Sequence, residues 1–402
     1  MREKPKSVVG SPPRGKDFWD REEEIREIWR ALERDHVLLV APRRFGKTGL
    51  MLHLMDHPEH GARVYYLDTE WIEGPADFIA EFTAELLKDK AIARLFEGAK
   101  NFFGGVLDRI KAVGVAEFFK VELKERIAKD WREKGREFIL RLKGVDGHVV
   151  FLIDEFPLML SRMLKKNPGE AEEFLHWFRG IRQMPDLSNV RFVVGGSIGV
   201  EHVLKKTGVG RAAINDLRPI RIEAFSEEKA REFIRALLRS EANLKRIPAG
   251  LPDKFMEILE VPVPFFIQIL VSESIREAER QGKPLSAEII EKAYSERVLA
   301  SYNRTYFEHY YTRLKEYYSP EDANVAKAIL RELARRREMS RDELWSLFQI
   351  LSEGKGDEEK FSYLLSDLEN DFYIQFDPAS GSYRFATKVL RDWWLRHYAA
   401  LR

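Results

Sequence analysis

The sequence predicts an α/β fold with a parallel sheet, followed by an all-helical segment and a small C-terminal domain of helices and a hairpin. Short apolar runs alternate with helical patterns up to about residue 225, which is typical of a parallel sheet covered by helices. Beyond that point the apolar residues recur with helical spacing until a strand-turn-strand pattern near the C-terminus. A chain of 402 residues is long enough for two or three domains.

Five strands are expected in the first half of the chain, where apolar runs are short and bounded by helical patterns. They cover residues 36–41, 62–70, 147–156, 189–199 and 218–225. A helix precedes the first strand at 20–35, and residues 76–143 form a long helical insertion between the second and third strands. Residues 1–16, with several prolines and glycines, predict a flexible leader. We therefore expect an α/β core over 17–225.

The second half is expected to be helical over 226–300, with an aromatic-rich linker helix at 301–318. A domain of several helices and one hairpin follows. Its helices are expected at 323–337, 340–351, 358–371 and from 388 onward, and its hairpin at 373–386. Ser340 and Glu343 have the spacing of a helix capping box. Three helices followed by a hairpin are the layout of a winged helix, so we expect a linker and winged-helix domain over 301–402.

Composition narrows the class of protein. The 67 basic and 66 acidic side chains give a net charge of +1, which provides no global case for binding nucleic acid or anionic membranes. The absence of cysteine excludes disulfides, thiolate metal sites and a cysteine nucleophile. No apolar run approaches the roughly 20 residues that span a bilayer, and no signal peptide is recognisable, so we expect a cytoplasmic protein. The 33% share of charged residues favours a heat-adapted source.

A phosphate-binding loop is indicated by the stretch HVLLVAPRRFGKTGL at 36–50, in which an apolar strand leads through a short loop into a helix. Such a loop directs backbone N–H groups at phosphate from a helix N-terminus, and adds a lysine and a hydroxyl. Gly46 allows close backbone approach, Lys47 would bridge the β- and γ-phosphates, and Thr48 would bind Mg²⁺. A lysine and threonine that merely begin a helix are the alternative. The residues expected to surround the nucleotide are Ala41, Pro42, Arg43, Arg44, Phe45, Gly46, Lys47, Thr48 and Gly49.

A second motif places two acids at the end of the most apolar strand, in the stretch HVVFLIDEF. Ligands of open α/β sheets bind at the carboxyl ends of the strands, where Asp154 and Glu155 are expected. Asp154 can hold Mg²⁺, and Glu155 can orient or deprotonate an attacking water. An acidic pair that caps the next turn is the alternative. Together with Lys47 and Thr48, the pair favours a nucleotide site. Ser197, at the end of the fourth strand, could contact the γ-phosphate or satisfy a local turn.

These motifs resemble those of the archaeal ATPases of the signal-transducing (STAND) branch of AAA+ proteins. The likeness lies in FWDREEEI, VLLVAPRRFGKT, VFLIDEF and VVGGSIG, and continues through a helical lid and a winged helix. It implies Lys47, Thr48, Asp154 and Glu155 in the roles given above.

The resemblance also implies roles for residues outside these motifs. It places Phe18 to Arg21 near the adenine, and Ser197 at a sensor position. A lid element at 261–264, VPVP, would bring Pro264 to the nucleotide, although valines stand where glycine is usual. Arg211 and Arg218 are candidates for sensing the γ-phosphate, or ordinary ion-pair partners.

DNA binding by the winged helix is disfavoured by charge. Its third helix region, 357–370, carries five acids and one base, whereas each phosphate contact needs a cation. We therefore expect a protein partner, through the winged helix or the insertion 76–143, and the chain could also form oligomers.

The function expected is Mg²⁺-dependent binding and hydrolysis of ATP to ADP, as a nucleotide-controlled molecular switch. The alternatives are a DNA-associated ATPase and a nucleotide-binding module without turnover.

Overall fold

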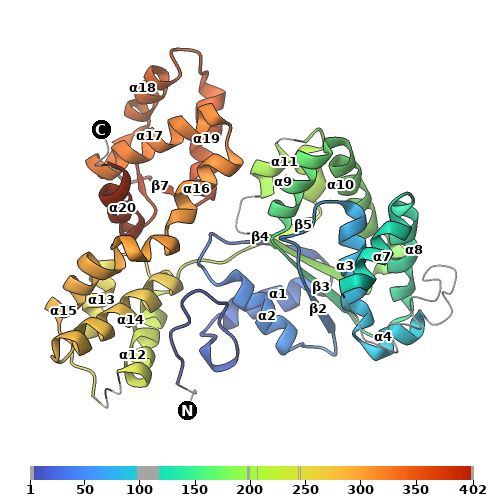
Figure 1. Ribbon diagram of the computed structural model, residues 1–402, viewed down its shortest axis with the longest axis horizontal. Helices are drawn as coiled ribbons and strands as arrows, with labels where there is room; N and C mark the ends of the chain where they lie inside the picture. The colour runs from blue at the N-terminus through green and yellow to red at the C-terminus, as the bar shows by residue number, and fades with distance from the viewer. Residues whose placement is uncertain are drawn as a thin grey trace. The chain divides into compact units, whose positions relative to one another are not determined.

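The computed structural model describes residues 4–96, 117–196, 200–205, 207–242, 244 and 246–399. The chain divides into two compact units (Figure 1). One, here called the sheet unit, comprises Arg21–Ala41 and Leu50–Ile222. The other, called the helical unit, comprises the residues up to Asp20, the segment Pro42–Gly49, and the residues from Glu223 onward.

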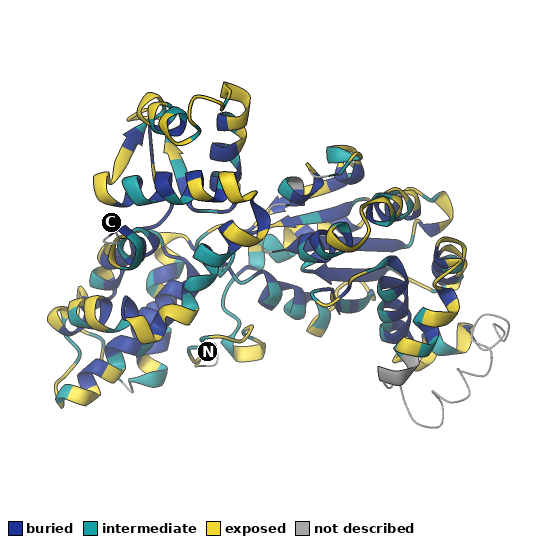
Figure 2. Ribbon diagram, turned by 45° about the horizontal axis from the view of Figure 1, so that its top comes forward, coloured by how far each residue is buried: buried dark blue, intermediate teal, exposed yellow. Residues whose placement is uncertain are grey.

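The sheet unit is built on five parallel strands in the order β2-β3-β4-β1-β5. They are β1 (His36–Val40), β2 (Arg63–Asp68), β3 (Val149–Asp154), β4 (Val190–Gly196) and β5 (Leu217–Arg221). All five strands expected from the sequence are therefore confirmed. Every residue of β3 and β4 is buried, as their dark blue colour in Figure 2 shows. Continuous burial explains why both strands are apolar without alternation.

Helices cover this sheet and connect its strands. They are α1 (Glu22–Leu32), α3 (Pro75–Leu87), α4 (Lys90–Leu95), α7 (Glu117–Ile127), α8 (Trp131–Leu140), α9 (Phe156–Lys166), α10 (Pro168–Arg182) and α11 (Val200–Leu204), with short 3₁₀ turns at Arg141–Gly144, Pro185–Leu187 and Gly210–Ile214. The described part of the insertion is helical, as expected. Aromatic rings fill the core between α3 and the sheet: Phe82 lies 4.2 Å from Phe151, which lies 5.5 Å from Phe192. Such ring pairs add to the burial of apolar area.

His36 begins β1 and is held there as a neutral ring. Its Nδ1 accepts the backbone N–H of Phe192 at 3.1 Å, so its Nε2 carries the proton and donates to the carbonyl of Arg182 at 2.9 Å. Burial, aided by the charges of Arg182 and Arg191, lowers the pKa of His36 to about 4. The strand that leads into the phosphate loop is therefore fixed at its amino end by an uncharged histidine.

The helical unit contains the lid and the winged helix. Its helices are α12 (Glu227–Glu241), α13 (Leu251–Leu259), α14 (Pro264–Gln281), α15 (Ala287–Ala293), α16 (Glu308–Tyr317), α17 (Pro320–Arg336), α18 (Arg341–Leu351), α19 (Glu358–Asn370) and α20 (Lys388–Trp394), with shorter turns at Gly15–Asp17, Tyr294–Val298, Ser301–Tyr306 and Leu395–Ala399. The capping box of Ser340 and Glu343 is present. The helix α2 (Lys47–Asp56) begins in this unit and ends in the sheet unit.

The winged helix has the expected three helices and hairpin, with one addition. The hairpin consists of β7 (Ile374–Asp377) and β8 (Ser382–Phe385). A third strand, β6 (Glu338–Ser340), pairs with β8 and extends the hairpin to a three-stranded sheet. The sequence did not predict β6, because three residues between two helices carry no recognisable alternation. Among the described residues no helix is long and apolar enough to cross a membrane.

The lid and the winged helix are joined by specific contacts rather than by a loose linker. The hydroxyl of Tyr294 donates to Asp392 at 2.8 Å, and Lys388 donates to the carbonyl of Ile258 at 3.2 Å. Phe307 of the linker stacks on Trp393 at 5.6 Å, so the aromatic C-terminal helix packs on the linker. These buried contacts explain why both parts fall in one compact unit.

The segment expected to be a flexible leader is anchored on the lid. The backbone N–H of Val8 donates to Gln268 of α14 at 2.7 Å, and that of Ser7 donates to Glu241 at the end of α12. Pro13 touches the first turn of α2, where a Cβ added to Gly49 would lie 3.1 Å from the proline ring. The described part of the leader is therefore part of the helical unit, and it contacts the end of the phosphate loop.

Candidate functional site

Asp154 is the last residue of β3 and is buried within the sheet unit. One carboxylate oxygen accepts the backbone N–H of Glu155 at 2.9 Å, and the other accepts the hydroxyl of Tyr66 at 3.2 Å. Its backbone carbonyl accepts both the N–H and the hydroxyl of Thr69, at 3.1 and 2.6 Å. The carboxylate is thus fixed in orientation at the carboxyl edge of the sheet, where ligands of such sheets bind.

Tyr66, Asp68 and Thr69 were not assigned from the sequence, and they belong to this cluster. Asp68 ends β2 directly opposite Asp154 in the strand register. Burial, together with the carboxylates of Asp68 and Glu155, raises the pKa of Tyr66, so its hydroxyl remains a donor to Asp154. The signal that could have found them is that β2 also ends in polar residues, next to the strand that ends in Asp154.

Glu155 lies at the strand-to-helix turn and adopts a left-handed backbone, with φ of 56°. This conformation is uncommon for a residue other than glycine, and such strain is concentrated at functional sites. The carbonyl of Glu155 accepts the N–H groups of Leu158 and Met159 in the first turn of α9. Glu155 is therefore the residue at which the chain turns from β3 into α9.

β4 ends on Gly196, and Ser197, the expected sensor, lies outside the described residues. A Cβ at Gly196 would lie 2.2 Å from the ring of Pro157 in α9. Only glycine allows this approach between the end of β4 and the turn after Asp154 and Glu155. Gly196, directly before Ser197, thus has a packing role that was not predicted from the sequence.

The phosphate loop follows β1 directly. Ala41 is buried at the strand end, and α2 begins at Lys47, whose side chain is buried. Arg44 and Gly46 both have positive φ, of 75° and 90°, so two left-handed residues in three curl the backbone before the helix. Alternating left-handed residues turn successive N–H groups toward one side, which is how backbone nests bind anions. Thr48 follows in the first turn of α2, as the motif requires.

The middle of the loop, which belongs to the helical unit, contacts the lid, the linker and the winged helix of the same unit. The guanidinium of Arg44 lies 4.3 Å from the ring centre of Phe265, and Phe45 meets Phe372 edge-on at 4.7 Å. The carbonyl of Arg43 accepts the hydroxyl of Tyr310 at 3.4 Å. Pro42 and these three residues were predicted only as part of the nucleotide-binding loop; the contacts with Phe265, Tyr310 and Phe372 could not be read from the sequence.

The residues expected near the adenine divide between the units. In the helical unit, Trp19, which follows Phe18, stacks on Phe233 of α12 at 5.4 Å, and Asp20 pairs with Lys229 at 2.8 Å. In the sheet unit, Arg21 precedes α1 with φ of 80° and pairs with Glu24 at 2.6 Å.

The lid element also packs within the helical unit. Pro264 is buried in the first turn of α14, next to Phe265.

The two candidate sensor arginines differ in position. Arg218 stands opposite Val37 near the amino end of β5 and pairs with Asp35 at 3.5 Å. It therefore lies toward the edge of the sheet away from the phosphate loop, and is better explained as an ion-pair partner. Arg211 is exposed in a 3₁₀ turn. Arg221, opposite Val40 at the carboxyl end of β5, is an arginine at the expected edge that the sequence reasoning passed over.

The donor atoms suit Mg²⁺ bound together with phosphate. Thr48 offers a hydroxyl and Asp154 a carboxylate, and Mg²⁺ prefers such oxygens and completes its octahedron with water and substrate phosphates. Within the described ranges, no group of three or more acidic or histidine side chains forms a metal site by itself. One hydroxyl and one carboxylate fit a Mg²⁺ ion that is bound together with nucleotide phosphates.

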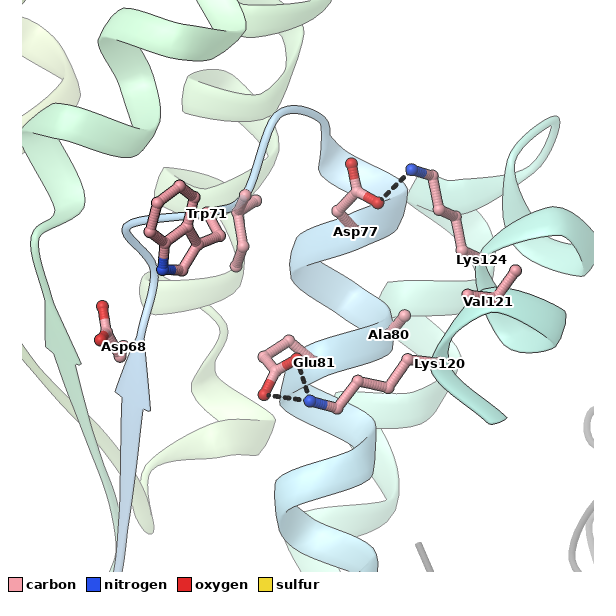
Figure 3. Close-up of a pocket in the computed structure, with 9 residues that line it drawn as sticks. Asp68, Trp71, Asp77, Ala80, Glu81, Lys120, Val121 and Lys124 are labelled. Carbon is pink, nitrogen blue, oxygen red and sulfur yellow. Dashed lines mark hydrogen bonds and ion pairs between the residues drawn. The ribbon is translucent and has the colours of Figure 1, made fainter. Parts of the chain in front are cut away.

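A pocket of about 490 Å³ opens beside the carboxyl end of β2 (Figure 3). Figure 3 shows Asp68 and Trp71 on the strand side, α3 in the middle and α7 beyond it. On the helical side two ion pairs join these helices, Lys124 with Asp77 and Lys120 with Glu81. The acids on α3 are thus neutralised by the insertion helix α7.

The strand side of this pocket is open to solvent. There Trp71 is 75% exposed, with Arg162 stacked 5.0 Å from its ring. Across the pocket, Val121 of α7 is 56% exposed. Asp68 is also exposed, and its carboxylate accepts the N–H of Glu70. A large aromatic side chain this exposed, beside the carboxylate of Asp68, is typical of contact sites.

Comparison with solved structures identifies the architecture. The Walker-type ATPase paby2304 of Pyrococcus abyssi has a TM-score of 0.62 and 20% identity over 97% of each chain. The Aeropyrum pernix ORC2 protein, solved as ADPNP-ADP complexes, has a TM-score of 0.53 and 11% identity over 91% of this chain and 88% of that one. No protein-family model and no curated protein matches the sequence.

The fold is that of a P-loop NTPase. The expected α/β core with a parallel sheet, followed by a helical lid and a winged helix, is confirmed. At these identities the likeness establishes the fold, and the activity has to be argued from the residues of this chain.

Proposed function

We propose that this protein is a Mg²⁺-dependent ATPase that acts as a molecular switch, in the manner of the signal-transducing branch of AAA+ proteins that its motifs resemble. The observation that carries the proposal is the end of β3. There Asp154 is buried and oriented by Tyr66 and Thr69, and Glu155 follows it in a strained turn. The same sheet contributes β1, which leads directly into a loop with the curl and the lysine that phosphate binding requires.

In this proposal each residue has one task. The backbone N–H groups of the loop that follows Pro42, together with the ammonium of Lys47, bind the β- and γ-phosphates. Thr48 and Asp154 hold Mg²⁺, which neutralises charge on the phosphates when bound. Glu155 orients the attacking water and accepts its proton. Phe18, Arg21 and Pro264 are assigned to the nucleotide's adenine and lid contacts, and Ser197 to the γ-phosphate, on the resemblance alone.

For the partner of the switch we favour the insertion over the winged helix. The support is the pocket at Trp71, because its neighbours Asp68 and Glu70 have no ion pair among the described residues and suit a partner protein with a basic side chain. Trp71 lies two residues after Thr69, which holds the backbone of Asp154. A partner bound at Trp71 would therefore contact residues that adjoin Thr69 and, through it, Asp154.

The DNA-associated alternative is weakened by how the winged-helix cations are used. Lys360, the single base of the third helix, pairs with Asp322 at 3.0 Å. Arg341 lies 3.6 Å from Glu358 and donates to Ser362 at 2.7 Å. Phosphate contacts would have to replace these interactions. A salt-sensitive shift of duplex DNA by the full chain would restore this alternative.

The proposal is tested by titrating the full chain with fluorescent MANT-ATP and Mg²⁺. We expect the wild type to bind, and Lys47→Ala to weaken binding about a hundredfold or more, because the lysine charge meets two phosphates. Lys90→Ala, an exposed lysine in α4, is the matched control and should bind like the wild type. Equal affinity in Lys47→Ala and the wild type would refute the site.

A binding module without turnover is separated by measuring ATP hydrolysis in the wild type and in Glu155→Gln. We expect turnover to fall by about a hundredfold or more in Glu155→Gln while MANT-ATP still binds, because the amide cannot accept the water's proton. Glu70→Gln makes the same change at the end of β2 and should keep wild-type turnover. If the wild type binds ATP without hydrolysing it, the binding-module alternative stands.

A further inference from the structure

The outer face of the phosphate loop is covered by three aromatic side chains that come from three separate parts of the helical unit. Phe265 lies in the first turn of the lid helix α14, Tyr310 lies in the linker helix α16, and Phe372 lies between α19 and β7 of the winged helix. Each contacts a different one of the residues Arg43, Arg44 and Phe45. The middle of the loop is thus enclosed by residues more than two hundred positions away in the sequence.

The contact with Arg44 bears on the loop's conformation. Arg44 holds a left-handed backbone, which for a residue other than glycine needs support from its surroundings. Burial lowers the pKa of its guanidinium, and its Nε has no hydrogen-bond partner among the described residues. The ring of Phe265, at 4.3 Å from the guanidinium, is a favourable partner for this half-buried cation. Phe265 therefore stabilises the turn that curls the loop.

The contact with the winged helix is equally firm. Phe372 sits between two buried residues: Asp371, which accepts from Tyr318 and pairs with Arg313, and Tyr373. The hydroxyl of Tyr373 donates to the carbonyl of Tyr310 at 2.6 Å. Phe372 is therefore linked to Tyr310 through its neighbour Tyr373. The edge-on contact of Phe372 with Phe45 transmits this position to the loop one residue before Gly46.

A neutral histidine lies next to Tyr310, beside the arginines of the loop. His309, next to Tyr310, is largely buried, and neither of its ring nitrogens has a hydrogen-bond partner among the described residues. Burial and the charges of Arg43, Arg44 and Arg313 lower its pKa, so it stays neutral beside the loop. A neutral ring is the form that such a cluster of arginines tolerates.

We propose that Phe265, Tyr310 and Phe372 are positioning residues of the phosphate loop: they hold it in the curled, phosphate-binding form, so that nucleotide affinity depends on the docking of the winged helix. This inference rests on the proposed nucleotide site and names how it is regulated. By thermodynamic linkage, whatever undocks the winged helix weakens nucleotide binding, and bound nucleotide strengthens the docking by the same factor.

The test is a MANT-ATP titration of Phe265→Leu and Phe372→Leu in the full chain. Leucine keeps much of the buried volume and removes the aromatic contact with the loop. We expect the Kd to rise about threefold to tenfold in each variant. Phe376→Leu, the same change four residues away, is the matched control. Phe376 packs on Tyr383 of the hairpin at 5.1 Å, so the Phe376→Leu variant should bind MANT-ATP with the wild-type Kd.

A double-mutant cycle with Arg44→Gly separates positioning from general loosening of the fold. Glycine adopts the left-handed turn at no steric cost, so the loop should no longer depend on Phe265. Adding Phe265→Leu to Arg44→Gly should then change the Kd less than twofold. If Phe265→Leu does not fold, Arg44→Lys changes the same contact from the loop side and should raise the Kd about threefold.

Three outcomes decide the matter. Wild-type binding with an unchanged Kd in Phe265→Leu and Phe372→Leu would overturn the positioning role and leave the proposed function intact. An equal effect of Phe265→Leu with and without Arg44→Gly would also overturn it. Absence of MANT-ATP binding in the wild type would refute the proposed function, and the positioning role with it. Slower hydrogen exchange at 371–373 in the presence of ATP is the linked result expected.

Discussion

The two halves of the proposed site are held in different ways. At the end of β3, Asp154 is fixed by its neighbours within the sheet: the adjacent strand contributes Tyr66, and the turn after it contributes Thr69. The middle of the phosphate loop is instead fixed by aromatic residues of the lid, the linker and the winged helix. One half is part of a continuous hydrogen-bonded sheet, and the other depends on the docking of helices.

This difference suggests which half can act as a switch. The buried strand end is held by close packing and by hydrogen bonds within the sheet, so we expect it to keep its geometry when the helices undock. A loop held by a few ring contacts can lose them together when the helices undock. The proposed catalytic carboxylates would then keep their positions. The affinity for phosphate would vary with whether the winged helix is docked on the loop.

The largest effect on stability is expected from Gly196→Ala, which tests the rigidity of the strand half. The new methyl group would lie 2.2 Å from Pro157 Cδ, and neither β4 nor the start of α9 can move without disturbing the buried sheet. We expect the free energy of unfolding to fall by about 3 kcal/mol. The measurement is urea-induced unfolding followed by circular dichroism.

The matched control for this prediction is Gly180→Ala in α10. No atom lies within 4 Å of its added Cβ, and alanine favours a helix by up to about 1 kcal/mol over glycine. The same substitution should therefore destabilise at 196 and stabilise slightly at 180. Wild-type stability in Gly196→Ala would show that the strand half is more yielding than we infer.

Acid should lower the stability of the sheet unit, because His36 at the start of β1 is held as a neutral ring. Its pKa is about 4 in the folded chain and 6.5 ordinarily, so the unfolded chain binds the extra proton between these values. Stability contributed by the neutral ring is therefore complete above pH 6.5 and is lost as the pH falls toward 4, by roughly 3 kcal/mol. We expect the stability advantage of the wild type over His36→Gln to shrink across this range. An advantage that is constant from pH 7 to 4 would contradict the assignment.

A smaller effect on activity is expected from Tyr66→Phe. The variant removes the hydroxyl that donates to Asp154 at 3.2 Å and keeps the ring, so the carboxylate loses one of its supports. We expect kcat to fall about threefold to fivefold, with little change in KM for ATP. Tyr65→Phe, whose hydroxyl binds Asp89 instead, is the control in the same strand. A change in KM alone would assign Tyr66 to nucleotide binding rather than to Asp154.

The smallest effect is expected from Gly49→Ala at the end of the phosphate loop. The added methyl group would meet the ring of Pro13 at 3.1 Å, which is tight by only a few tenths of an ångström, against 2.2 Å at Gly196. We expect the Kd for MANT-ATP to change less than about twofold. A rise in the Kd well beyond twofold would show that the leader segment holds the phosphate loop firmly.

The same contrast explains what the sequence could predict. The strands and the pair Asp154 and Glu155 follow from local patterns, since an apolar run and the polar residues after it lie together in the chain. The supports of the loop do not, because Phe265 and Phe372 are ordinary apolar residues in helical patterns and only the folded chain brings them to Arg44 and Phe45. The strand β6 was not predicted for a different reason: three residues are too few to show the two-residue period of a strand.

The most direct test of the central claim is to identify the nucleotide that remains bound after the full chain is incubated with Mg²⁺ and ATP and then separated from free ligand. The account predicts ADP on the wild type, ATP on Glu155→Gln, and almost no nucleotide on Lys47→Ala. Recovery of intact ATP from both the wild type and Glu155→Gln would contradict the assignment of Glu155 to hydrolysis. Equal nucleotide on all three proteins would contradict the site itself.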